Sequence, residues 1–108
     1  MPVNSEYNPI VSVVVPVFNG AEHIGDCIEA LLNQDFPLGS YDIIIVNNRS
    51  TDKTQEIIDR YPVRSLFEEK RGPAAARNTG IRAATAEFVA FTDADCIPQR
   101  DWLHKLVG

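Results

Sequence analysis

The distribution of apolar residues along the chain predicts four β-strands. Residues 10–17 and 41–46 are almost unbroken apolar segments rich in β-branched side chains, which is typical of strands buried on both faces of a parallel sheet. Residues 63–67 alternate between apolar and polar side chains, so this segment favours a strand nearer an edge. Residues 87–92 predict the fourth strand, and strands therefore recur over most of the chain.

Between these strands, apolar residues return at the three- and four-residue spacing of amphipathic helices. A short helix is expected after residues 50–52, whose side-chain oxygens suit the N-cap position. Another is expected to begin at Gly72 and Pro73, because proline is well tolerated in the first helical turn. Pro98 is expected to open the last helix. The clearest apolar stripe belongs to the first helix and consists of Ile24, Cys27, Ile28, Leu31 and Leu32.

Strict alternation of strands and helices predicts an α/β fold, a three-layer α/β/α sandwich around a mostly parallel sheet. All 108 residues are expected to form a single domain. Ligands in such folds bind beyond the carboxyl ends of the strands, where the strand order reverses. The candidate site should therefore lie in the segments that follow the four strands, which are residues 16–20, 47–52, 68–72 and 93–96.

Composition narrows the choice of partner and location. The net charge of −5 argues against nucleic acid, which selects basic surfaces. The longest apolar runs are far shorter than the roughly 20 residues of a membrane span, and residues 1–9 lack the pattern of a signal peptide, so a cytoplasmic location is expected. Cys27 and Cys96 lie 69 positions apart and match no metal-binding or redox motif.

The first two strand ends offer aromatic and amide side chains. Pro16, Phe18 and Asn19 lie at the first end, where an aromatic ring can stack on a flat base, a contact that contributes about 1–3 kcal/mol. Asn47 and Asn48 follow the second strand, and their amides can both donate and accept hydrogen bonds. Each feature has a structural alternative, because the ring also suits closing the end of the sheet and asparagines are common in turns.

The fourth strand end carries the most specific signal, the sequence Asp93-Ala94-Asp95. Alternate residues of an extended chain share a face, so both carboxylates are expected to point into one crevice. Such oxygen ligands suit Mg²⁺ or Mn²⁺ ions that also contact substrate phosphates. Arg71 and Arg77 add guanidinium groups suited to phosphate or base contacts, although each also fits a solvated surface position. Together these residues predict a nucleotide site with a metal-binding mouth.

Four sequence blocks resemble family 2 glycosyltransferases, in the order in which that family carries them. The first strand and its end, IVSVVVPVFN, are similar to the family's VSVVIPVYN. The blocks IIVNNRSTD, GPAAARNTG and FTDAD are similar to the family's VVDDGSTD, GxxxARNxG and FLDADD. Together the blocks cover nearly the whole chain. The resemblance implies a GT-A fold with a Rossmann-like sheet of strand order 3-2-1-4, and sugar transfer with inversion from a nucleotide donor.

The resemblance also implies roles for individual residues. Phe18 takes the position of the aromatic residue that stacks on the base, commonly uracil, and Asn48 that of a residue bonded to the imide edge of the base. Asp93 falls where the family contacts the ribose or the metal shell, and Asp95 where it ligates the metal, Mn²⁺ or Mg²⁺. Arg77 falls where a basic side chain holds the nucleotide. The implied donor is a nucleotide-diphosphate sugar, expected to be UDP-linked, with an unknown acceptor.

Two departures from the family pattern bear on function. Asn47 and Asn48 replace positions that are usually or often acidic, and Arg49 replaces a glycine, which favours a changed base preference. The family's general base is an acidic residue in an acceptor-binding half that would follow Gly108. The chain is therefore expected to be the donor-binding half alone, without a catalytic residue that can be named. A non-catalytic nucleotide-binding or interaction domain derived from the same fold is the main alternative.

The order of the elements adds two expectations. A phosphoacceptor receiver domain also alternates strands and helices, but it needs an acidic cluster after its first strand, where this chain has Phe18 and Asn19. With strand order 3-2-1-4, residues 87–92 would form an exposed edge without protective lysine or proline, so self-association through this strand is expected. The resemblance also fits a location at the cytoplasmic face of a membrane.

Overall fold

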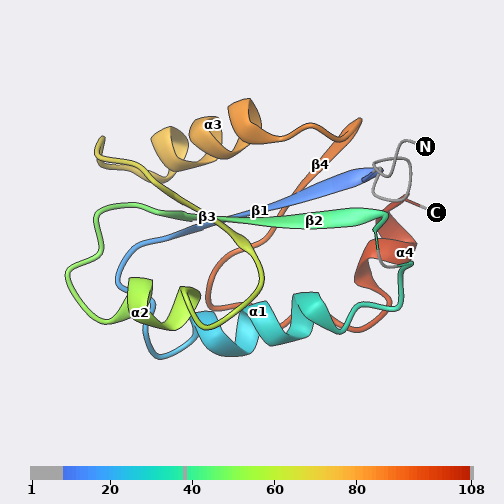
Figure 1. Cartoon of the computed structure of the whole chain (residues 1–108), viewed down its shortest axis with the longest axis horizontal. Coiled ribbons are helices and arrows are strands. Elements are labelled where there is room, and N and C mark those ends of the chain that lie inside the picture. Colours follow the sequence, from blue (N-terminus) through green and yellow to red (C-terminus); the bar gives the residue numbers. More distant parts are fainter. Residues whose placement is uncertain (1–8, 38, 108) are drawn as a thin grey trace, which may run out of the picture.

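The computed structural model describes residues 9–37 and 39–107 and confirms the predicted alternation of strands and helices. The elements agree with the predicted segments to within one residue for each strand (Figure 1). In chain order they are β1 (Val11–Val17), α1 (Ile24–Leu32), β2 (Tyr41–Asn47), α2 (Thr54–Ile58), β3 (Arg64–Phe67), α3 (Pro73–Ala83), β4 (Phe88–Phe91) and α4 (Trp102–Val107).

The described strands form one parallel sheet in the expected order, β3-β2-β1-β4. β1 pairs with β2 along its whole length, from Val11 opposite Tyr41 to Val17 opposite Asn47. β4 pairs only with the first four residues of β1, ending at Val14 opposite Phe91. The end of β1 therefore loses its neighbour on one side. The strand order reverses at this same boundary between β1 and β4, which is where open α/β sheets bind ligands.

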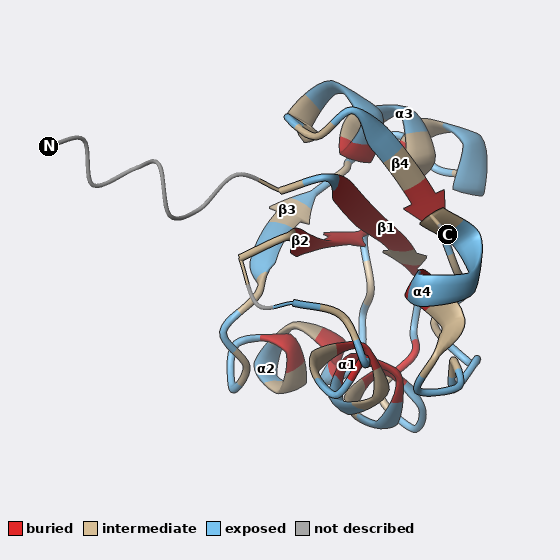
Figure 2. Ribbon diagram, turned by 90° about the vertical axis from the view of Figure 1, so that its right-hand side faces the viewer, coloured by how far each residue is buried: buried red, intermediate tan, exposed pale blue. Residues whose placement is uncertain are grey.

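Helices cover both faces of the sheet, as the sequence predicts. Figure 1 shows α3 on one face and α1, α2 and α4 on the other. Odd-numbered residues of β1, such as Val13 and Val15, pack with the three-helix layer, whereas Val14 packs with Ala76 of α3. The two central strands are the most buried elements (Figure 2). Burial on both faces explains why β1 and β2 are apolar without alternation.

α3 lies very close to the sheet because small residues form its inner face. Gly80 is buried, and a methyl group in place of its hydrogen would overlap the side chain of Val14. Ala76, one turn earlier, is fully buried on the same face. Glycine lowers helix propensity by about 1 kcal/mol relative to alanine, so close packing against β1 is the reason for this residue.

The helices are short, and α4 begins later than the sequence suggests. The expectation that Pro98 opens this helix is wrong, because α4 starts at Trp102. Its first turn depends on the buried side chain of Gln34, whose Oε1 accepts from the Leu103 N–H (2.9 Å) and whose Nε2 donates to the Gln99 carbonyl (2.7 Å). Within the described part of the chain, no helix is long and apolar enough to cross a membrane.

Candidate functional site

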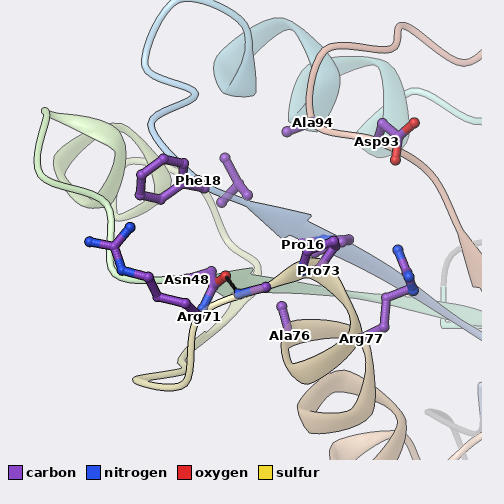
Figure 3. Close-up of a pocket in the computed structure, with 11 residues that line it drawn as sticks. Pro16, Phe18, Asn48, Arg71, Pro73, Ala76, Arg77, Asp93 and Ala94 are labelled. Carbon is purple, nitrogen blue, oxygen red and sulfur yellow. Dashed lines mark hydrogen bonds between the residues drawn. The ribbon is translucent and has the colours of Figure 1, made fainter.

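A cavity of about 330 Å³ opens at the carboxyl end of the sheet, beside the end of β1, which β4 no longer flanks. It brings together five of the residues that the sequence assigns to the site, from three different strand ends and from α3 (Figure 3). These five are Pro16, Phe18, Asn48, Arg77 and Asp93. The rest of the wall consists of Val17, Arg71, Gly72, Pro73, Ala76 and Ala94.

Phe18 and Arg71 form one end of this cavity. The Phe18 side chain does not close the end of the sheet, because the residue is 51% exposed. The Arg71 guanidinium carbon lies 5.7 Å from the centre of the Phe18 ring, within the range of a cation–π contact (Figure 3). An exposed ring and a planar cation at the mouth of a cavity offer stacking surfaces for a flat ligand.

Asn48 holds the loop that carries Arg71. Its Nδ2 donates to the carbonyls of Glu68 (3.0 Å) and Lys70 (2.8 Å), and its Oδ1 accepts from the Gly72 N–H (3.0 Å). The last of these bonds is drawn in Figure 3. Both amide protons are therefore used, whereas Oδ1 keeps one acceptor position. Asn48 thus fixes the loop between β3 and α3 and still presents an oxygen to the cavity.

Asn47 and Asn19 lie outside this cavity, and their side chains form hydrogen bonds within the fold. Asn47 is 2% exposed, and its side chain donates to Gln55 Oε1 (2.8 Å) and accepts from the Ser50 N–H (3.0 Å). Asn19 adopts a left-handed conformation (φ 50°), and its Oδ1 accepts from the Thr51 N–H (2.7 Å). Asn19 lines a neighbouring cavity, together with His23 and Asp95. Asn47 therefore lines neither cavity, whereas Asn19 shares the neighbouring cavity with Phe18.

Residues 50–52 tie two loops together but do not provide the N-cap of α2 that the sequence predicts, because the N-cap residue is Lys53. Ser50 Oγ accepts from the Asn19 N–H (2.9 Å), and Asp52 Oδ2 accepts from the Ala21 N–H (3.2 Å). Asp52 Oδ1 accepts from both the hydroxyl and the N–H of Thr54, the first residue of α2. The Thr54 hydroxyl, helped by the backbone N–H groups, lowers the pKa of Asp52.

Asp93 and Asp95 form the opposite, acidic side of the site. Asp93 lines the main cavity, and Asp95 lines the neighbouring one. One ligand atom from each of Asp93, Asp95 and Cys96 lies within 4.8 Å of the others. All three residues are exposed, and no ion pair within residues 9–37 and 39–107 involves either carboxylate. Two converging carboxylates that are free of cationic partners are a suitable donor set for a divalent cation.

The sequence analysis did not assign Cys96 or Pro73 to the site, and it left Arg71 undecided between ligand and solvent. Cys96 follows directly after Asp95, and this adjacency is the signal that could have included it. Arg71 reaches Phe18 only because Asn48 holds the intervening loop, a contact that no local pattern predicts.

Comparison with known proteins gives one family and a consistent set of relatives. The family model described as "Glycosyl transferase family 2" matches residues 12–108. Glycosyltransferase AglE of Haloferax volcanii is 38% identical over 106 residues, which cover 93% of this chain and 35% of AglE. This chain therefore spans about a third of the length of that relative.

Solved structures with the same arrangement contain nucleotide ligands. The crystal structure of residues 1–349 of Staphylococcus aureus TarS in complex with UDP-GlcNAc has a TM-score of 0.83 at 30% identity, over 90% of this chain and 30% of the crystallised TarS chain. The mannosyltransferase PcManGT of Pyrobaculum calidifontis, in complex with GDP-Man and Mn²⁺, has a TM-score of 0.82 at 36% identity. That match covers 94% of this chain and 32% of PcManGT. The resemblance extends through the whole described sheet.

Proposed function

Because this chain belongs to glycosyl transferase family 2, we propose that it is the donor-binding part of a glycosyltransferase and binds a nucleotide-diphosphate sugar through a divalent metal. The observation that carries the proposal is the composition of one cavity at the reversal of strand order. Its one end offers the exposed Phe18 ring and Arg71, and its other end offers Asp93 next to Asp95. The first end suits a flat nucleotide base, and the second end suits a metal ion bound to a diphosphate.

The base is proposed to lie at the Phe18 end. The ring would stack on the base. The Gly72 N–H occupies one lone pair of Asn48 Oδ1, and the other lone pair would accept from the imide N–H of the base. A uridine base carries such a donor. TarS is solved with a uridine nucleotide and PcManGT with a guanosine nucleotide, so the relatives support nucleotide binding more strongly than one base. UDP is the proposed nucleotide because a single free acceptor matches one imide N–H.

The diphosphate and metal are proposed to lie toward the fourth strand end. Asp95 would ligate Mn²⁺ or Mg²⁺ directly, and Asp93 would contact the ribose or complete the metal shell. A divalent cation at this position neutralises charge on the diphosphate leaving group. Arg77 lies on the α3 wall of the same cavity and would hold the nucleotide by charge-assisted hydrogen bonds. Pro16 lacks an N–H and would contribute an apolar contact at the floor.

Residues 1–108 are proposed to form a single nucleotide-sugar-binding domain. Acceptor binding and the catalytic base would come from other residues of a glycosyltransferase, because AglE is about three times as long as the matched region. The free edge of β4 is proposed to support self-association, since it carries the exposed Phe88 and Phe91 and contains no lysine or proline.

Isothermal titration calorimetry with UDP tests the proposal. We expect binding in Mn²⁺ or Mg²⁺ and a large loss of affinity in EDTA, with Phe18→Ala weakening binding by roughly tenfold, as expected for one stacking contact. Ile81→Ala removes another exposed apolar side chain, on the outer face of α3, and serves as the matched control. Equal affinity with and without EDTA would exclude the metal role. Tighter binding of GDP than of UDP would correct the base, and no binding of either nucleotide would refute the proposal.

A further inference from the structure

The turn that follows Phe18 is held by side chains from the segment that leads into α2. Three consecutive backbone N–H groups after the ring each donate to a side-chain oxygen that lies more than 30 residues away in the chain. The pairs are Asn19 with Ser50 (2.9 Å), Gly20 with Thr54 (2.9 Å) and Ala21 with Asp52 (3.2 Å). The shape of this turn therefore depends on the side chains of residues 50–54.

The bond from Gly20 to Thr54 differs from the other two because it is buried. Thr54 is 0% exposed and Gly20 is buried, whereas the bonds to Ser50 and Asp52 are exposed. Water can replace an exposed acceptor, but a buried N–H that loses its acceptor stays unsatisfied. Gly20 also packs tightly, since a methyl group on it would overlap the Val17 side chain. The Thr54 hydroxyl therefore makes the contact that holds this turn most firmly.

Asp52 orients the Thr54 hydroxyl. The O–H donates to Asp52 Oδ1, which leaves the hydroxyl oxygen to accept from the Gly20 N–H. Thr54 lines neither of the two cavities that share Phe18. An effect of Thr54 on a bound ligand therefore has to pass through the turn.

We infer that Thr54 is a positioning residue of the nucleotide site, whose hydroxyl fixes the turn after β1 and thereby the Phe18 ring that stacks on the base. The inference rests on the proposed function, because the position of the ring affects affinity only if a base stacks on it. Phe18 is 51% exposed and lies against the exposed Arg71, so core packing does not hold its ring in place. A ring that is already fixed in the free protein loses less freedom on binding and supports tighter binding.

Calorimetry with UDP in Mn²⁺ tests the effect on binding. Thr54→Val keeps the shape of the side chain but removes the hydroxyl, and it should weaken UDP binding severalfold, by less than the roughly tenfold loss expected for Phe18→Ala. Thr54→Ser restores the hydroxyl and should restore affinity. In the Phe18→Ala background, Thr54→Val should have no further effect, because the ring that it positions is gone. An equal loss in both backgrounds, or no loss in either, would overturn the inference.

A probe on the ring gives a readout that does not depend on nucleotide. With 4-fluorophenylalanine incorporated in place of Phe18, we expect one ¹⁹F resonance away from that of the urea-unfolded protein. Thr54→Val should broaden this resonance and move it toward the unfolded position, and Thr54→Ser should restore it. A resonance that Thr54→Val leaves unchanged would show that the hydroxyl does not position the ring.

Tyr41→Phe is the matched control for a general loss of stability. The Tyr41 hydroxyl is also buried and donates to the Leu31 carbonyl (2.8 Å), at the amino end of β2 and opposite the site. Its removal should lower the free energy of unfolding in urea but leave UDP affinity and the Phe18 resonance unchanged. If Tyr41→Phe changes both as Thr54→Val does, lost stability explains the effect and the inference fails.

Two further outcomes keep the test decisive. If Thr54→Val does not fold, Ser50→Ala removes only an exposed bond of the same turn and should move the Phe18 resonance in the same direction by less. An unchanged resonance in Ser50→Ala would then count against positioning by these side chains. If UDP fails to bind the unaltered protein in any metal, the proposed function is refuted, and the ring resonance still decides whether Thr54 positions Phe18.

Discussion

The second and fourth strand ends both carry polar side chains, but these side chains make different contacts. After β2, the side chains of Asn47, Asn48 and Asp52 are engaged in hydrogen bonds to backbone or side-chain groups. After β4, Asp93 and Asp95 are exposed and have no cationic partner among the described residues. A polar group engaged within the fold stabilises it, whereas an exposed carboxylate without a partner can bind a ligand with little loss of stability. Mutations at the two ends should therefore separate stability from binding.

The largest expected effect is on metal-dependent binding at the fourth end. Asp95→Asn should reduce UDP affinity in Mn²⁺ by at least the roughly 10- to 100-fold loss typical of residues that only support a metal ligand. Its free energy of unfolding should not change, because the side chain is exposed. Calorimetry and urea unfolding measure the two quantities. Glu56→Gln, an exposed carboxylate on α2, is the control. If Asp95→Asn instead unfolds the protein, the Asp95 side chain stabilises the fold, and the two strand ends do not differ in the way described above.

At the second end, Asn48→Asp should mainly reduce stability. An aspartate cannot donate to the carbonyls of Glu68 and Lys70, and its charge would face both oxygens. The expected loss is about 2–3 kcal/mol in the free energy of unfolding, since a buried group loses its partners. Urea unfolding measures it, with the exposed Asn78→Asp as the matched control. Unchanged stability would show that the loop before α3 does not depend on the Asn48 amide.

The pH dependence of stability tests Asp52, whose pKa is lowered chiefly by the Thr54 hydroxyl. A carboxyl with a lowered pKa in the folded state stabilises the protein above its unfolded pKa of about 3.9, and this contribution disappears as the pH falls through the lower folded value. Asp52→Ala should therefore lower the free energy of unfolding at pH 7 by about 1 kcal/mol at most, the net contribution of a typical hydrogen bond. The difference should be smaller in acid than at pH 7, because this contribution is lost as the pH falls through the lowered pKa of the folded state.

Urea unfolding at both pH values provides the measurement. Glu69→Gln, in the loop before α3, is an exposed control without a described hydrogen bond. A difference between Asp52→Ala and the unaltered protein that is the same at both pH values would show that the ionised carboxylate is not the stabilising group.

The smallest expected effect is on self-association through the free edge of β4. Val89 packs against the α3 cluster, so Val89→Lys would disturb the core. Phe88 is half exposed, and Phe88→Lys should lower the apparent mass of the protein in light scattering at high concentration. Ile81→Lys, on the outer face of α3, is the control. A monomer that neither substitution changes would contradict association through β4.

The sequence predicts the sheet well because its signals are local. Unbroken apolar runs identify β1 and β2, and the four family blocks place the strands in the observed order. The start of α4 is not predictable in this way, since it depends on Gln34, a side chain 69 residues earlier in the chain than Leu103, to which it is bonded. The separate orientations of Asn47 and Asn48 depend on contacts with α2 and with the loop before α3. Two adjacent asparagines thus have different roles, because their hydrogen-bond partners come from different parts of the chain.

The approach of Cys27 and Cys96 is also a product of the fold. Their 69-residue separation carries no motif, yet the Cys27 thiol and the Cys96 N–H both donate to the carbonyl oxygen of Asp93. A pattern search along the chain has no means of detecting two groups that share one acceptor. Composition and spacing therefore predict the two carboxylates of the proposed metal site but not the sulfur beside them.

The close contact between Gly80 and Val14 holds α3, which forms one wall of the cavity, near β1. Arg77 lies three residues before Gly80 on α3, and it reaches the cavity because the helix axis lies close to β1. One added carbon atom at position 80 would push this part of α3 away from the sheet and carry the Arg77 guanidinium outward with it. The size of ligand that the cavity accepts therefore depends on a residue that does not line it. Attempts to change donor selectivity by redesigning the wall should keep the helix-to-sheet distance at Gly80 constant, or use it deliberately as an adjustable dimension.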